Sequence, residues 1–234
     1  MVESRISTAR IGIVRTGIVI STIALLCSAC STSWTPFQGA VLHPIQIFSE
    51  STEVRGLRVG GIYGKNESVY GIDVGGVNLA TELDGIGAGG VNVVEERVRG
   101  AQLGAVNMAG VVDGLAVGGW NQADLHVRGA QLAMLANHAG SLDGVGIALT
   151  NWVDDSVKGA QIGVVNIAAE VTGVQLGGIH NQSEIVVGAQ IGGLVNHADK
   201  LHGLQIGFLN FNRSGPLPFF PIFNFGFSDE SEED

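Results

Sequence analysis

The sequence has little positive charge, little proline and almost no cysteine. Only 12 Lys and Arg residues stand against 22 Asp and Glu residues, which gives a formal net charge of −10. Nucleic-acid binding needs clustered basic side chains, so this balance argues against a nucleic-acid partner and against attraction to anionic lipid. Proline occurs 5 times and glycine 36 times, while 45% of residues are hydrophobic. That combination fits neither a collagen-like chain nor a disordered one.

The N-terminus has the organisation of an export signal. Three arginines among the first 15 residues precede a short apolar run at 18–26, which is too short for a comfortable membrane span of about 20 residues. The run ends in Cys27-Ser-Ala-Cys30, which resembles a bacterial lipoprotein cleavage box. Residues 1–29 would then be a lipoprotein signal peptide, and Cys30 would carry the acyl chains that anchor the protein.

Two details bear on this interpretation. The resemblance departs from the usual pattern at Cys27, where Leu is common, and the alternative is an ordinary secretory peptide that leaves Cys30 as a free thiol. Ser31 follows Cys30, and by resemblance to the sorting rules of Gram-negative lipoproteins it favours a lipid-anchored position in the outer membrane. Both cysteines lie in this region, so the mature chain keeps one cysteine and forms no internal disulfide.

The body of the chain is a tandem repeat of 14 or 15 residues. Eleven units open with a glycine, from Gly56 to Gly203, and most read glycine–apolar–x–apolar–glycine–x–apolar–asparagine. Glutamine often stands two residues after the opening glycine, and Gly-Ala-Gln opens every other unit from 100 to 188, a superperiod of about 29 residues. The recurring asparagines are Asn78, Asn92, Asn107, Asn121, Asn137, Asn151, Asn166, Asn181, Asn196 and Asn210.

The pattern predicts an all-β repeat protein. Apolar pairs such as Leu115 and Val117 alternate with Gln, Gly or Ala, as in short strands, and charges concentrate in the second half of each unit, which we expect to form turns or an exposed edge. In a β-solenoid of 14–15-residue coils, equivalent residues stack about 4.8 Å apart. The asparagines would then form a hydrogen-bonded ladder, and the opening glycine would permit a positive φ at a corner.

The alternative is an antiparallel up-and-down β-barrel of the outer-membrane type, in which each unit is one strand and the superperiod is a hairpin. The solenoid is favoured because antiparallel neighbours would not align the constant asparagine. The predicted organisation is a lipid-anchored linker and N-terminal cap at 30–54, the repeat array at 55–213, an aromatic C-terminal cap at 214–227 and an acidic, disordered tail at 228–234.

Particular segments resemble a known family. Gly-Leu-Arg-Val-Gly-Gly-Ile-Tyr-Gly-Lys-Asn at 56–66, Val-Tyr-Gly-Ile-Asp-Val-Gly at 69–75 and the closing Pro-Phe-Phe-Pro-Ile-Phe-Asn-Phe-Gly-Phe at 218–227 are similar to the surface repeat-containing proteins of leptospires and other bacteria. The resemblance covers about 36–227. It implies an envelope location and surface exposure, and it supplies no catalytic residue. The sequence departs from the cleanest pattern at Ala116, Ala133 and Ala148.

Motifs that carry chemistry are weak in this chain. Gly85-Ile-Gly-Ala-Gly-Gly90 matches GxGxxG, but a nucleotide site needs a strand before the motif and a helix after it, and here it is one repeat unit. The two histidines that follow repeat asparagines, His138 and His197, are too far apart on a solenoid to share a metal. We therefore expect no cofactor, no metal site and no enzyme activity.

The sequence as a whole predicts a non-enzymatic cell-envelope lipoprotein. It would present a rigid β-repeat surface, with a structural, adhesion or protein-interaction role. Its partners would be the membrane, through the lipid anchor, and a protein or host-surface molecule. The alternative function follows the alternative fold, namely an outer-membrane-spanning barrel that acts as a pore.

Overall fold

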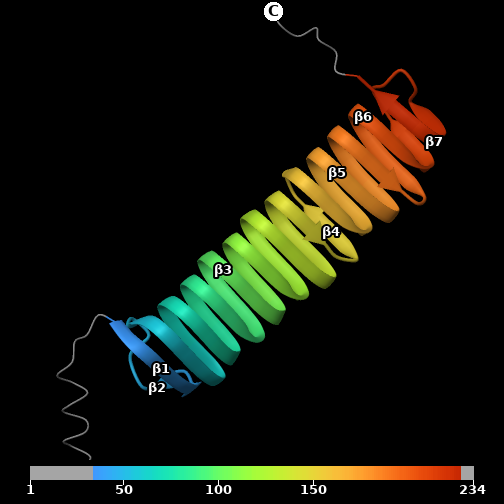
Figure 1. Ribbon diagram of the computed structural model, residues 1–234. Coiled ribbons are helices and arrows are strands. Elements are labelled where there is room, and N and C mark those ends of the chain that lie inside the picture. Colours follow the sequence, from blue (N-terminus) through green and yellow to red (C-terminus); the bar gives the residue numbers. More distant parts are fainter. Residues whose placement is uncertain (1–33, 228–234) are drawn as a thin grey trace, which may run out of the picture. The chain divides into compact units, whose positions relative to one another are not determined.

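The structure is a computed structural model that describes residues 34–227. The chain divides into a short unit, Met1–Trp34, and a compact unit, Thr35–Asp234. The described residues form strands joined by turns and bends, without a helix (Figure 1). The strands are β1 Trp34–Leu42, β2 Ile45–Gln46, β3 Glu53–Ile147, β4 Thr150–Val153, β5 Ser156–Gly192, β6 Val195–Asn212 and β7 Phe219–Gly226. The predicted signal peptide, Cys30 and the acidic tail lie outside the described residues.

Consecutive repeat units pair in parallel and in register. Asn137 lies opposite Asn151, Asn181 opposite Asn196, and Gly188 opposite Gly203. Each residue therefore pairs with its equivalent in the next unit, and β3 continues through many units as a single paired ribbon (Figure 1). This confirms the predicted β-solenoid of coils about 15 residues long. The antiparallel up-and-down alternative is wrong, because neighbouring units run in the same direction and stack like side chains on each other.

The opening glycines form a corner that no other residue fits. All eleven have φ between 126° and 145°, a conformation that L side chains rarely adopt. The stacking adds a second constraint, since a Cβ on Gly144 would lie 1.9 Å from the carbonyl oxygen of Gly129. The predicted positive φ is confirmed, and the close approach of successive coils explains why glycine occupies this position in every unit.

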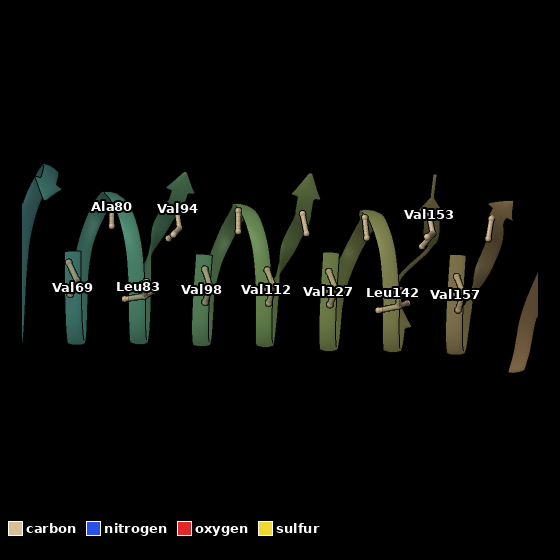
Figure 2. Close-up of a cluster of buried hydrophobic side chains, with 14 of the residues drawn as sticks. Val69, Ala80, Leu83, Val94, Val98, Val112, Val127, Leu142, Val153 and Val157 are labelled. Atoms are coloured by element: carbon tan, nitrogen blue, oxygen red, sulfur yellow. The ribbon is translucent and has the colours of Figure 1, made fainter. Parts of the chain in front are cut away.

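Four columns of side chains fill the interior. Two are apolar or small: the residue two before each opening glycine, such as Val98 or Leu142, and the residue two after each repeat asparagine, such as Ala109. The third consists of the repeat asparagines, and the fourth consists of the residue two after each opening glycine, which is polar in eight of the eleven units. Figure 2 shows one row formed by Val69, Leu83, Val98, Val112, Val127, Leu142 and Val157 along the stack, and a second row that includes Ala80, Val94 and Val153.

The apolar residues point in other directions than the sequence pattern suggested. The second half of each unit, expected to be a turn or an exposed edge, contributes the buried Val and Leu column. The apolar pair that follows each opening glycine faces outward instead, while the residue between the pair is buried. A strand alternates its faces with a period of two, so burying the Gln, Gly or Ala position forces its apolar neighbours into solvent.

A buried ion pair replaces glutamine in the first two coils. Arg58 is fully buried; its Nε donates to Asp73 Oδ1 at 2.7 Å and its Nη1 donates to the Leu79 carbonyl oxygen at 2.7 Å. Burial raises the pKa of the Asp73 carboxyl above its ordinary value, and Arg58 opposes that rise by hydrogen bonding and by its charge. The sequence pattern did not predict this pair.

Antiparallel strands close both ends of the array. At one end β2 pairs with β1 through Ala40 and Gln46, and at the other β7 pairs with β6 from Gly203–Gly226 to Phe211–Phe219. All five prolines lie in these end segments, at 36, 44, 216, 218 and 221. Proline has no N–H to donate to a further strand, so its placement suits the exposed edges of a stack.

Candidate functional site

The ten repeat asparagines form a continuous buried ladder. Each is at most 4% exposed, and the Nδ2 of each donates to the Oδ1 of the next, from Asn78 to Asn210, over distances of 2.7–3.0 Å. At the C-terminal end Asn210 donates to the carbonyl oxygen of Phe220 in β7. The predicted stacking of asparagines is therefore present in the structure, and it runs unbroken through ten coils.

Each asparagine also donates a hydrogen bond from the interior to a backbone carbonyl oxygen of the strand stacked on it. Asn151 Nδ2 donates to the carbonyl oxygen of Ile162 at 2.9 Å, and Asn166 Nδ2 donates to that of Leu176 at 2.9 Å. Both acceptors are the third residue after an opening glycine, and the same bond recurs from Asn78 onward. The ladder thus fixes the backbone of one particular outer face.

That outer face is apolar along its whole length. We define the apolar face as the first and third residues after each opening glycine; all 22 are exposed or half-buried and none is charged. The first residues are Leu57, Ile72, Ile86, Ala101, Leu115, Ala130, Val145, Ala160, Val174, Ala189 and Leu204. The third residues are Val59, Val74, Ala88, Leu103, Val117, Leu132, Ile147, Ile162, Leu176, Ile191 and Ile206.

The apolar face continues over both ends. In β7, Phe225 lies opposite Leu204 and Phe223 opposite Ile206, while Asn224 between them is buried opposite Gln205. In β1, Phe37 is 45% exposed and is followed by the fully buried Gln38. Both end strands therefore repeat the rule of the coils, with an amide inside and an aromatic ring outside.

The size of the apolar face distinguishes it from an ordinary surface. At about 4.8 Å per strand, the eleven units and the two end strands make a face about 60 Å long and, with side chains, about 10 Å wide. Its area of about 600 Å² is at the upper end for the largest apolar patch of a typical monomer, and patches of this size often mark interaction sites. Further exposed apolar side chains follow it two or three residues along the chain, among them Trp120, Met134, Leu149, Ile179 and Phe208.

Two grooves also mark the surface. An apolar groove of about 470 Å³ at the N-terminal end is lined by Phe37, Val41, Ile45, Ile47 and Val59, among others, and it adjoins the apolar face through Phe37 and Val59. A more polar groove of about 390 Å³ lies over the charged half of the units. Its lining includes Trp152, Asp154, Ile167, Glu184 and His197.

The titratable groups near the polar groove pair with their neighbours. His138 Nε2 lies 3.0 Å from Asp154 Oδ2, and His197 Nε2 lies 3.5 Å from Asp199 Oδ1. Within residues 34–227 no group of three or more His, Cys, Asp or Glu side chains could hold a metal ion. The GxGxxG segment at 85–90 lies on a coil, and the described part of the chain has no helix after it to cradle a phosphate.

The sequence contains the residues of the apolar face at regular positions, but it does not show that their side chains point outward. The recurring apolar pairs predicted strands, but they gave no direction, and apolar residues in strands are usually assigned to the core. The residue between the two apolar residues of each pair could have shown which way the pair points. It is Gln in six units and Gly or Ala in three others, and these residues suit a narrow interior in which amides stack.

Comparisons with protein-family models, with curated proteins and with solved structures found no match. The resemblance to surface repeat-containing proteins therefore stays a prediction from the sequence. Residues 34–227 contain no helix, and therefore none that could span a membrane.

Proposed function

We propose that this chain is a non-enzymatic, lipid-anchored protein of the bacterial outer membrane whose β-solenoid is a rigid surface for protein interaction. The observation that carries the proposal is the apolar face, which stays free of charged residues through eleven units and both end strands. A soluble protein gains nothing in stability from such a face in water. Its retention in every coil is explained if the face is covered in the working state.

Rigidity makes the face suitable for binding. The carbonyl oxygens of its third residues are held by the buried asparagines, as at Ile162 and Leu176. Backbone pairing between coils fixes the same strands a second time. Because little conformational freedom is left to lose, association costs less entropy than it would for a flexible surface.

The anchor rests on the sequence alone. Cys30 follows a basic region, an apolar run and two small residues, as in lipoprotein signals. Only three residues separate Cys30 from Trp34 in β1, so an acyl chain at Cys30 would tether the N-terminal end of the array close to the membrane. The pore alternative depended on antiparallel strands and is not proposed.

One experiment tests the anchor and the surface together. A photo-activated cross-linking residue is placed at Ile147, on the apolar face, or at Leu125, which is 66% exposed on another side of the coil. Each is made in the full chain, with Cys30 or with Cys30→Ser. We expect membrane fractionation that depends on Cys30, and discrete cross-linked species from position 147 but not from 125. Equal cross-linking from both positions would contradict the surface, and membrane association of Cys30→Ser would contradict the anchor.

A further inference from the structure

The first residues of the apolar face alternate in size. From unit four to unit eleven the order is Ala101, Leu115, Ala130, Val145, Ala160, Val174, Ala189 and Leu204. The third residues in these units, from Leu103 to Ile206, are all large. The 29-residue superperiod of the sequence is therefore a physical feature of one surface. It places depressions at the alanines beside a continuous apolar ridge.

The spacing of these depressions is set by the coil. Neighbouring strands lie about 4.8 Å apart, so alanines in alternate coils recur about every 9.6 Å. A fluid surface such as a bilayer has no such period, and a partner that matches it must carry apolar side chains at the same pitch. The described chain itself carries them, because Leu115, Val145, Val174 and Leu204 have the same spacing as the alanines.

We propose that the occupant of the apolar face is a second copy of this chain, packed face to face and antiparallel about a two-fold axis. The inference rests on the proposed function and names its partner. A two-fold axis that runs along the strand direction, midway between the coils of Val145 and Ala160, sets every large first residue of units four to eleven opposite an alanine. The pairs are Val145 with Ala160, Ala130 with Val174, Leu115 with Ala189, and Ala101 with Leu204, each with one residue from either copy.

The symmetry of the pattern singles out this arrangement. The eight alternating units begin with alanine and end with leucine, so reversing the order exchanges large for small at every position. A parallel pairing about an axis along the stack would instead set each coil against its own equivalent, with first residues against third residues. Coils with an alanine would then make two large–small contacts and coils without one would make two large–large contacts, whereas the antiparallel pairing gives every pair of coils one contact of each kind. Interdigitation of large and small residues is what close packing between two sheets requires.

The contact is large enough for specific association. With this axis, the strands from the Gly85 unit to β7 overlap, a length of about 48 Å, and a face about 10 Å wide gives about 500 Å² from each copy. The total of about 1,000 Å² is the lower bound for a biological interface. The absence of charge from the face means that no charged group is desolvated when it is covered.

The first test fills the depressions. Residues 31–234 are prepared without Cys30, and the dimer dissociation constant is measured by sedimentation. Ala130→Leu/Ala160→Leu adds apolar area but removes the fit, so we expect dimerisation to weaken about tenfold or more. Ala169→Leu, the same change beside the polar groove, should leave it unchanged. Circular dichroism verifies that each variant is folded.

The second test fixes the orientation. The starting chain has no cysteine, so Ala130→Cys/Val174→Cys can form disulfides only by design. These two positions are three coils apart, about 14 Å, which is too far for a bond within one chain. We expect a covalent dimer from the double variant and not from either single variant, because a two-fold antiparallel pair brings 130 of one copy onto 174 of the other.

Three outcomes would overturn the inference: a monomer at the highest soluble concentration, tighter association after the alanines are filled, or efficient cross-linking from a single-cysteine variant. A monomer that still cross-links to another protein through position 147 in the envelope would leave the proposed function standing and remove only the second copy as its partner.

Discussion

In the strand after most opening glycines, polar side chains face the interior and apolar side chains face the solvent, which is the reverse of the usual arrangement. In the strand that follows an opening glycine, the inward residue is an amide in six units, whereas its two outward neighbours are apolar in all eleven. From Gln161 to Gln205 these amides bond their equivalents in neighbouring coils, as from Gln175 to Gln161 at 2.7 Å. Inward residues therefore specify stacking, and outward residues are free to specify association.

A second comparison separates the two buried amide columns. The asparagine column is unbroken, while the glutamine column is continuous only from Gln161 to Gln205, with nearest distances of 2.7–2.8 Å. Toward the N-terminus it contains Gly87, Ala116, Gly146 and the Arg58–Asp73 pair. The difference follows from what each side chain binds. Asn151 donates to a backbone carbonyl of the next coil as well as to the next asparagine, whereas Gln161 donates to the carbonyl of Ile167 in its own coil.

The largest effect should come from the glycine corner. Gly144→Ala requires an L side chain at φ 142° and a Cβ 1.9 Å from a backbone oxygen. We expect the chain to lose more than about 4 kcal/mol or to fail to fold, because the coils must separate to admit the methyl group. Gly146→Ala, at a buried position that is Ala116 in another unit, is the control and should cost far less in denaturant unfolding.

The buried ion pair should come next. Arg58→Gln leaves Asp73 buried without its partner, and we expect a loss of about 3–5 kcal/mol, as when one member of a buried pair is removed. The double variant Arg58→Gln/Asp73→Gln extends the glutamine column into the first coils and should recover most of that stability. A double variant as unstable as the single one would show that Arg58 acts through its carbonyl contact to Leu79 and not through Asp73.

The two amide columns should differ under the same substitution. Asn151→Ala removes the acceptor of Asn137 and the donors to Asn166 and Ile162, so we expect a loss of about 2–4 kcal/mol from buried groups left unpaired. Gln131→Ala reproduces in a neighbouring coil what Ala116 already provides, and should cost about 1 kcal/mol. Equal losses in urea unfolding would remove the distinction between the columns.

The smallest effect concerns pH. Burial raises the pKa of Asp73, so the folded chain holds this proton more tightly than the unfolded chain does. The stability from this group is fully present below the ordinary aspartate pKa of about 3.9 and is lost as pH rises through the higher pKa of the folded state. Relative to the Arg58→Gln/Asp73→Gln variant, the wild type should therefore lose stability as pH rises from about 3 through that window. A difference in stability between the two proteins that does not change with pH would contradict this prediction.

The sequence was sufficient for the architecture because the repeat itself encodes it. Equal spacing of glycine and asparagine implies parallel, in-register coils, and the positive φ and the amide ladder follow from stacking. It was not sufficient for the direction of the side chains, since Leu115 and Val117 satisfy a strand pattern whichever way they point. The Arg58–Asp73 pair was also hidden, because charged residues two after an opening glycine meet in the interior only once that position is known to face inward. The apolar face could be recognised only when the repeat pattern of the sequence was combined with the side-chain directions in the structure.

The most direct test of the exchange between inside and outside uses two adjacent residues. Gln161 is fully buried and Ile162 lies on the apolar face. Each is changed to lysine, and the free energy of unfolding is measured together with self-association. We predict that Gln161→Lys loses several kcal/mol, because it buries an unpaired charge, and that Ile162→Lys changes stability by about 0.5 kcal/mol or less while abolishing association. The opposite result, with Ile162→Lys unfolding the chain and Gln161→Lys tolerated, would mean that the strand faces the other way.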